Sequence, residues 1–231
     1  MMKRYILTAA LLTLCTTQIW AEGTAIEGFE LSTAPINRND MDSIKRGAKF
    51  FAGTCASCHT LTYLRYDKVA KEAGIPTNNK PIAINGVTPP DLSLEASAKG
   101  VDWVYTYLQS FYKDTSTASG VNNLVFPGTA MPAILAPLQG EQVMVEKPMY
   151  DLTHHVQWFD VLKPVKQGSM KPGEFDETVT DLVNFLAYAA EPFHQEQQTI
   201  GYWVLGFLVI LFVLMYMLKK EYWKDVERHR E

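Results

Sequence analysis

The stretch Cys55-Ala56-Ser57-Cys58-His59 decides how this chain folds, because it places two thiols and an imidazole within five residues. Residues three and four apart lie on the same face of a helical backbone, so His59 shares a face with Cys55. At this spacing each thiol can add to one vinyl group of a haem, and the histidine can ligate the iron. The pentapeptide therefore predicts one covalently attached haem c, with His59 as the proximal ligand.

A Cys-x-x-Cys pair has two other uses, a redox-active dithiol and a disulfide that staples a loop. A dithiol site stands at the start of a helix that follows a strand. Here the pair comes late in a helical pattern, which opens at the capping residues Asn39 and Asp40. The apolar positions of this pattern are Ile44, Ala48, Phe51 and Cys55. The pattern favours haem attachment over the dithiol and the staple.

The first 21 residues have the composition of a secretory signal. Lys3 and Arg4 precede an apolar run over residues 6–14, and Ala21 offers a small residue at the cleavage site. Cys15 lies inside this segment after the bulky Leu14, which disfavours lipid attachment at Cys15. We expect residues 1–21 to be removed when the chain is exported.

Residues 200–218 form a run of 19 residues without a charged side chain. As a helix the run measures about 28 Å, which is enough to cross the hydrocarbon core of a bilayer. Aromatic residues stand near both margins, and Lys and Arg residues crowd positions 219–231, which indicates a cytoplasmic tail. The alternative, a buried core helix, would normally keep a polar face. The sequence predicts a single-pass protein of the bacterial inner membrane with its main domain in the periplasm.

Residues 22–199 remain, and 178 residues are enough for one domain with its own core. This segment holds 21 acidic and 14 basic residues, a net charge of −7. An acidic surface steers basic partners toward it and disfavours nucleic acid. The same charge also keeps a domain soluble, and both roles stay open at this point.

Helical patterns occupy three further parts of this domain, separated by stretches rich in turn residues. Residues 61–73 have helical composition, an aromatic stripe follows Asp102, and residues 179–190 form an amphipathic helix that ends before Pro192. Residues 74–101 and 113–174 read as loops, apart from a short alternating strand at positions 143–145. We expect a mainly α fold: a c-type cytochrome haem domain with long loops and little β structure, plus one C-terminal transmembrane helix.

Six short segments beside the haem motif resemble segments of the cytochrome c1 family, and they occur in the family's order. The resemblance covers essentially all of the exported domain and the tail anchor. Its most specific parts are Pro89-Pro90-Asp91-Leu92-Ser93 and Ala130-Met131-Pro132. The others are Leu64-Arg65-Tyr66, Asn85-Gly86, Phe126-Pro127-Gly128 and Ala189-Ala190-Glu191-Pro192.

The resemblance implies haem contacts that spacing alone does not provide. Met131 would be the sixth iron ligand, and His/Met coordination raises the reduction potential. His154 and His155 are the rival axial candidates, although adjacent histidines in a polar segment are usually surface residues. Pro89 and Pro90 would line the haem crevice, whereas their plainer role is to stiffen a loop.

Two basic residues keep two possible roles each. The family carries an arginine that pairs with a haem propionate, and Lys99 lines up with that position here. Lysine can neutralise a propionate but cannot bind it with two parallel hydrogen bonds, so Lys99 is either a propionate partner or a solvated charge. Arg65 either reaches the haem edge or caps its own helix.

The resemblance also implies a function, the electron-transfer subunit of the cytochrome bc1 complex, which is the quinol:cytochrome c oxidoreductase or complex III. Such a subunit takes one electron from a Rieske iron-sulfur protein and passes it to a soluble or membrane-bound cytochrome c. Cytochrome b would be the other membrane partner, in a complex expected to be dimeric, and this chain would supply no catalytic residue of its own. Two alternatives are a free-standing membrane-anchored cytochrome, acting as carrier or gas or redox sensor, and a tail-anchored thiol oxidoreductase.

Overall fold

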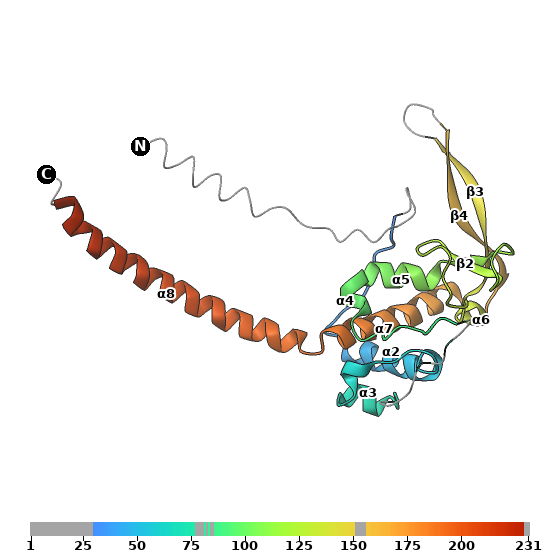
Figure 1. Cartoon of the computed structure of the whole chain (residues 1–231), viewed down its shortest axis with the longest axis horizontal. Coiled ribbons are helices and arrows are strands. Elements are labelled where there is room, and N and C mark those ends of the chain that lie inside the picture. Colours follow the sequence, from blue (N-terminus) through green and yellow to red (C-terminus); the bar gives the residue numbers. More distant parts are fainter. Residues whose placement is uncertain (1–29, 77–80, 82, 84–85, 151–155, 229–231) are drawn as a thin grey trace.

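A computed structural model describes residues 30–76, 81, 83, 86–150 and 156–228 of the chain (Figure 1). The predicted signal segment 1–21 with Cys15 lies outside the described residues, as do Asn85, His154 and His155. Helices dominate the described part, which confirms the predicted mainly α class. The longer helices are α2 (Met41–Thr54), α5 (Val101–Gln109), α7 (Pro172–Ala190) and α8 (His194–Arg228), and the short ones are η2 (Thr62–Leu64), α3 (Lys68–Glu72), α4 (Glu95–Lys99) and α6 (Ala136–Gln139).

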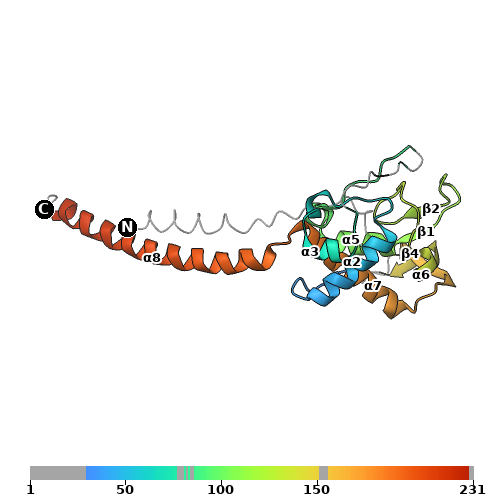
Figure 2. The same ribbon diagram turned by 90° about the horizontal axis from the view of Figure 1, so that it is seen from below.

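Helices α2 and α7 pack side by side and form the scaffold of the domain (Figures 1 and 2). The α2 helix begins where predicted, because the Asp40 carboxylate accepts hydrogen bonds from the N–H groups of Asp42 and Ser43. Its apolar face meets that of α7 at Phe51 and Phe185, whose ring centroids lie 5.7 Å apart. Both side chains are fully buried, so this contact lies at the centre of the hydrophobic core.

The two scaffold helices approach closely at Gly47 of α2. A Cβ atom added at Gly47 would overlap the backbone carbonyl of Asp181 in α7, which no side-chain rotation can relieve. The neighbouring Arg46 donates two hydrogen bonds to the Asp181 carboxylate, at 2.6 and 2.8 Å. The glycine thus permits the close helix contact. The bidentate Arg46–Asp181 ion pair beside it fixes the register of α2 against α7.

We expect Gly47→Ala to destabilise the protein by about 1–3 kcal/mol or more, because overpacking against backbone forces the helices apart. Gly53 is a matched control, since it also lies in α2 and a Cβ there would meet nothing within 4 Å. Gly53→Ala should be neutral or stabilising by up to about 1 kcal/mol. Thermal unfolding of both full-length variants in detergent, followed by circular dichroism, measures the difference. Equal stability of the two variants would contradict the close contact.

The region predicted as one helix over residues 61–73 is two short helices, η2 and α3, because Asp67 begins a new helix by accepting a hydrogen bond from the Ala70 N–H. The prediction of a loop over residues 74–101 is wrong in part, because this region contains the helix α4. Gly100 separates α4 from α5 with a φ of 90°, a conformation that suits glycine. Both α4 and α5 pack against α7.

A small sheet, of which the sequence predicts only one short strand, lies beside the helices. Its strand order is β2-β1-β3-β4, with β1 (Phe111–Lys113), β2 (Val121–Asn123), β3 (Gly140–Tyr150) and β4 (Val156–Gln167). The predicted strand at Val143 and Val145 is confirmed as part of β3, which pairs antiparallel with β4 from Gly140↔Gln167 onward. This long hairpin projects from the domain (Figure 1).

The C-terminal helix α8 extends away from the rest of the described chain in both ribbon views (Figures 1 and 2). Its segment Glu196–Lys224 is long and apolar enough to cross a membrane, with a mean hydropathy of 2.3 over its most apolar window. The apolar side chains of this segment are exposed, as a membrane-spanning helix requires. The described helix confirms a candidate membrane anchor at the C-terminal end and includes the predicted run 200–218.

Candidate haem site

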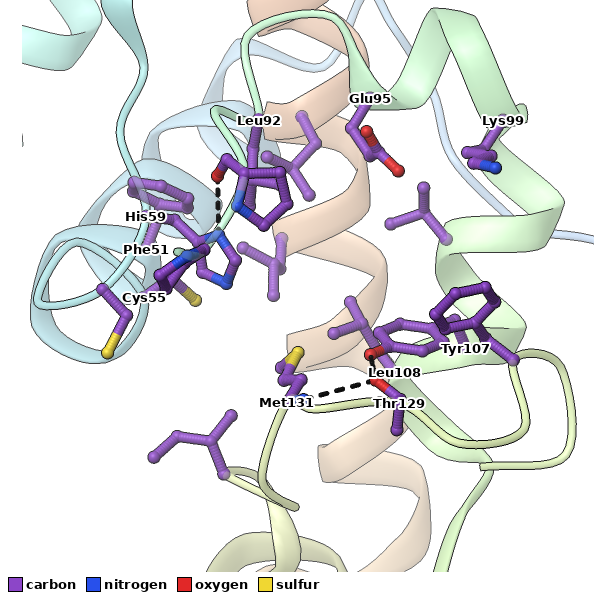
Figure 3. A pocket seen from close by; sticks show the side chains of 18 of the residues that line it. Phe51, Cys55, His59, Leu92, Glu95, Lys99, Tyr107, Leu108, Thr129 and Met131 are labelled. Atoms are coloured by element: carbon purple, nitrogen blue, oxygen red, sulfur yellow. Dashed lines mark hydrogen bonds between the residues drawn. The ribbon is translucent and has the colours of Figure 1, made fainter. Parts of the chain in front are cut away.

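A cavity of about 390 Å³ opens between the end of α2, the segment around Pro89 and Pro90, helices α4, α5 and α7, and the loop that carries Met131 (Figure 3). Its volume is typical of a small-molecule or cofactor site. Buried side chains of the scaffold form its floor, among them Phe51, Leu182 and Leu186. Among the described residues that line the cavity, the carboxylate and ammonium side chains are those of Glu95 and Lys99. Most of the wall is therefore apolar.

The end of α2 delivers both cysteines and the histidine to this cavity. Cys55 is the C-cap residue of the helix, and its N–H donates to the carbonyl of Phe51 at 2.8 Å. The turn then continues, because the N–H groups of Cys58 and His59 both donate to the Cys55 carbonyl, at 3.1 and 2.9 Å. All three side chains line the cavity, and both cysteines are free thiols.

The imidazole of His59 is oriented by the proline-rich segment. Its Nδ1 lies 2.9 Å from the carbonyl oxygen of Pro90, an acceptor, so Nδ1 carries the proton (Figure 3). In this tautomer Nε2 is the ring nitrogen that can ligate a metal. A hydrogen bond of this kind fixes the orientation and the tautomer of a ligating histidine.

Asp91 fastens this proline-rich segment to the residues that follow His59. One carboxylate oxygen of Asp91 accepts hydrogen bonds from Thr60 Oγ1 at 2.5 Å and from both the N–H and the hydroxyl of Thr62, at 2.9 and 2.6 Å. The other accepts from the Ser93 N–H at 2.9 Å, and the Leu92 N–H donates to the Thr60 carbonyl. Partial burial raises the pKa of Asp91, but the hydrogen bonds from Ser93, Thr60 and Thr62 outweigh it and hold the pKa well below the usual value.

We expect this carboxylate to give the protein an acid-sensitive stability. The folded-state pKa lies below the ordinary value of 3.8, so the contribution is complete above about pH 4 and is lost as the pH falls toward the folded-state value. The melting temperature of the wild type should drop between about pH 4 and about pH 2 more steeply than that of Asp91→Asn. Asp176→Asn, at an exposed carboxylate of α7, is the control that should keep the wild-type slope. A wild-type slope in Asp91→Asn would contradict this assignment.

Met131 faces the cavity from the opposite wall. It lies in the loop between β2 and α6, and Figure 3 shows its sulfur directed into the same space as the His59 ring. The Met131 N–H donates to Thr129 Oγ1 at 3.3 Å, and that oxygen lies 2.8 Å from the hydroxyl of Tyr107. Gly128 gives the loop its bend, with a φ of 77° and an N–H that donates to Asn122 Oδ1.

The structure brings most of the predicted site residues together. Cys55, Cys58, His59, Met131, Pro89, Pro90 and Lys99 all line the cavity. Lys99 also lies over the ring of Trp103, with 5.4 Å between its Nζ and the ring centroid. Arg65 is outside the cavity lining, where its Nε donates to the Thr62 carbonyl at 3.2 Å and its guanidinium lies over the Tyr66 ring.

Two residues at this site were missed as functional residues. Tyr107 belongs to the aromatic stripe that follows Asp102, which was not predicted to take part in a site, and Thr129 belongs to a loop with no local pattern. Steps of four along α5 do indicate that Trp103 and Tyr107 share a face, but nothing local says that this face borders a cavity. The contact of Tyr107 with Thr129, 22 positions apart, has no signal in the sequence.

The residues present fit haem c. Two thiols and a histidine stand at one wall, a thioether stands at the other, and the wall between them is mostly apolar, with the basic side chain of Lys99 also in the lining. A thiol pair, an imidazole with a fixed tautomer and an apolar cavity are together the parts of a c-type cytochrome site.

Comparison with known proteins agrees with this class. The model of the Cytochrome C1 family matches residues 31–79 and 73–226. The chain is 41% identical to cytochrome c1 of Allochromatium vinosum, with 96% of this chain and 99% of that protein covered. It is 25% identical to the mitochondrial cytochrome c1 heme protein of Neurospora crassa, over 80% of this chain and 62% of that protein. The chain therefore belongs to the cytochrome c1 family.

One further relative carries a different name. The chain is 39% identical to a protein of Nitrosomonas europaea named ammonia monooxygenase gamma subunit, with 85% of this chain and 89% of that protein covered. This similarity includes most of the chain, so it extends beyond the haem motif.

Proposed function

We propose that this chain is the haem c subunit of a cytochrome bc1 complex. The observation that carries the proposal is the placement of Cys55, Cys58 and His59 opposite Met131 across one apolar cavity, in a chain of the cytochrome c1 family. When bound, the haem supplies a one-electron ferric/ferrous couple. The subunit would receive electrons singly from a Rieske iron-sulfur protein and deliver them to a periplasmic or membrane-bound cytochrome c.

Under this proposal the chain's own residues bind and tune rather than react. Cys55 and Cys58 would hold the haem through thioethers, and His59 and Met131 would ligate its iron. The Pro90 carbonyl keeps the imidazole in one tautomer, and Asp91 keeps the Pro90 segment in place. The apolar wall would limit the access of water to the haem, and ligands held by the fold would leave little to rearrange between the two oxidation states.

The proposal extends to location and partners. The α8 segment Glu196–Lys224 would cross the bacterial inner membrane once, with the haem domain in the periplasm and the basic tail in the cytoplasm. Cytochrome b and the Rieske protein would be membrane partners, in a dimeric complex. Catalysis, the oxidation of quinol coupled to proton release, belongs to the whole complex and not to this chain.

An optical difference spectrum tests the proposal. The tagged protein is purified from membranes in mild detergent, and spectra of its oxidised and reduced forms are compared. We expect a c-type band accompanied by b-type bands, with all of them reduced by quinol. A c-type band alone would point to the free-standing carrier or sensor, or to a different complex such as the name of the Nitrosomonas europaea relative suggests.

A further inference from the structure

A chain of two hydrogen bonds connects helix α5 to the backbone of Met131. The Tyr107 hydroxyl lies 2.8 Å from Thr129 Oγ1, and the same oxygen accepts a hydrogen bond from the Met131 N–H at 3.3 Å (Figure 3). Thr129 Oγ1 has one proton and two lone pairs, so it can serve both contacts at once. The pair thus ties the Met131 loop to a helix of the cavity wall.

The helical end of this tether is rigid. The Tyr107 ring stacks on Trp103, with ring centroids 5.0 Å apart and an interplanar angle of 8°, and meets the edge of Phe111 at 5.1 Å. These aromatic contacts fix the ring in place, so the position of its hydroxyl is set by the helix. Burial raises the pKa of Tyr107, although its hydrogen bond with Thr129 acts the other way, so the hydroxyl stays neutral at physiological pH.

The other end of the tether lies in the loop that carries Met131. The loop is held before Thr129, where Asn122 Oδ1 and Asn123 Oδ1 accept from the N–H groups of Gly128 and Val125. Beyond that anchor lie Thr129, which is buried with 7% of its surface exposed, and the half-buried Met131. The proposed ligand therefore stands three positions past Gly128, whose backbone adopts a positive φ, and Tyr107 contacts the loop between the two.

We propose that Tyr107, acting through Thr129, is a positioning residue that holds the sulfur of Met131 at the sixth coordination position. The inference rests on the proposed haem function and adds to it a group that does not touch the iron. Loss of one hydroxyl should shift the balance between bound and released Met131, and so make the iron more open to external ligands.

Tyr107→Phe tests the tether, because it keeps the ring and its stacking and removes only the hydroxyl. Tyr105→Phe is the matched control, since Tyr105 is a buried tyrosine of the same helix that does not line the cavity. We expect carbon monoxide to bind the reduced Tyr107→Phe protein roughly threefold to tenfold faster than the wild type, the factor that one net hydrogen bond contributes. The charge-transfer band of methionine-ligated ferric haem should weaken, and the reduction potential should fall.

A second pair of variants guards against a folding defect in Tyr107→Phe. Thr129→Val removes the shared oxygen and should reproduce the effect, whereas Thr129→Ser keeps the oxygen and should retain the wild-type values. If the wild type shows methionine-ligated haem, and Tyr107→Phe and Thr129→Val match it in binding rate and band intensity, the tether is overturned and the proposed function stands. A wild type that lacks methionine-ligated haem overturns the proposed function and this inference together.

Discussion

Replacing Met131 with alanine should leave the haem covalently attached, lower its reduction potential and open the iron to carbon monoxide. The thioether is the soft ligand that favours the ferrous state, so its loss stabilises the ferric state. Axial ligands tune haem potentials over a range of about 0.8 V, and we expect a fall of more than about 100 mV. Redox titration of the purified complex, followed at the c-type band, measures this shift.

Met144→Ala is the matched control for this substitution. Met144 lies on β3 with 40% of its surface exposed, and it does not line the cavity. It should keep the wild-type potential and remain closed to carbon monoxide. An unchanged potential in Met131→Ala would remove Met131 from the coordination sphere, and would return attention to His154 and His155, which lie outside the described residues.

The half of the site that is local in sequence was predictable, because its signals are local. The sequence before the motif has a capping aspartate, Asp40, and an apolar repeat, and the structure forms helix α2 there. The same is true of α7, whose apolar repeat and closing proline are visible in the sequence. Where neighbouring residues set the geometry, as from Cys55 to His59, spacing alone was a sufficient guide.

The other half of the site depends on contacts between distant segments. Met131 could be selected only through the family resemblance, since a methionine in a proline-rich loop has no helical or strand period. Asp91 holds the proline-rich segment through Thr60 and Thr62, about 30 positions earlier, and no pattern within Pro89-Pro90-Asp91 predicts this role. The contact between Tyr107 and Thr129 also joins distant segments, so no local pattern predicts it.

Most of the β3–β4 hairpin was not predicted for a different physical reason. Pro148 lies in β3 and Pro164 in β4, and proline within a run of residues argues against a strand because it cannot donate to the ladder. Pro148 lies beyond Val143, where β1 pairs with β3, and Pro164 lies in the edge strand β4 beside a register shift, so neither proline interrupts a central ladder. The local signal was therefore correct for a central strand and misleading for a projecting hairpin.

Removing both thiols should abolish the covalent bond between protein and haem. In each addition the sulfur bonds to one vinyl carbon and the thiol hydrogen goes to the other, so no oxidant is required. Cys55→Ser and Cys58→Ser should each retain haem through one thioether, and the double variant should retain none. Mass spectrometry of the denatured protein measures this directly, because the wild type and both single variants should exceed the polypeptide mass by one haem.

The matched control is Ser57→Ala, which alters an exposed residue between the two cysteines and should keep the full haem mass. A wild-type polypeptide without haem would instead support the thiol oxidoreductase, which needs a thiolate at neutral pH. Burial, together with the neighbouring Cys58 thiol, raises the pKa of Cys55 to about 12, so Cys55 is protonated under those conditions. A protonated thiol is a poor nucleophile for disulfide exchange. The same environment that disfavours dithiol chemistry at Cys55 is an apolar cavity wall suited to a porphyrin.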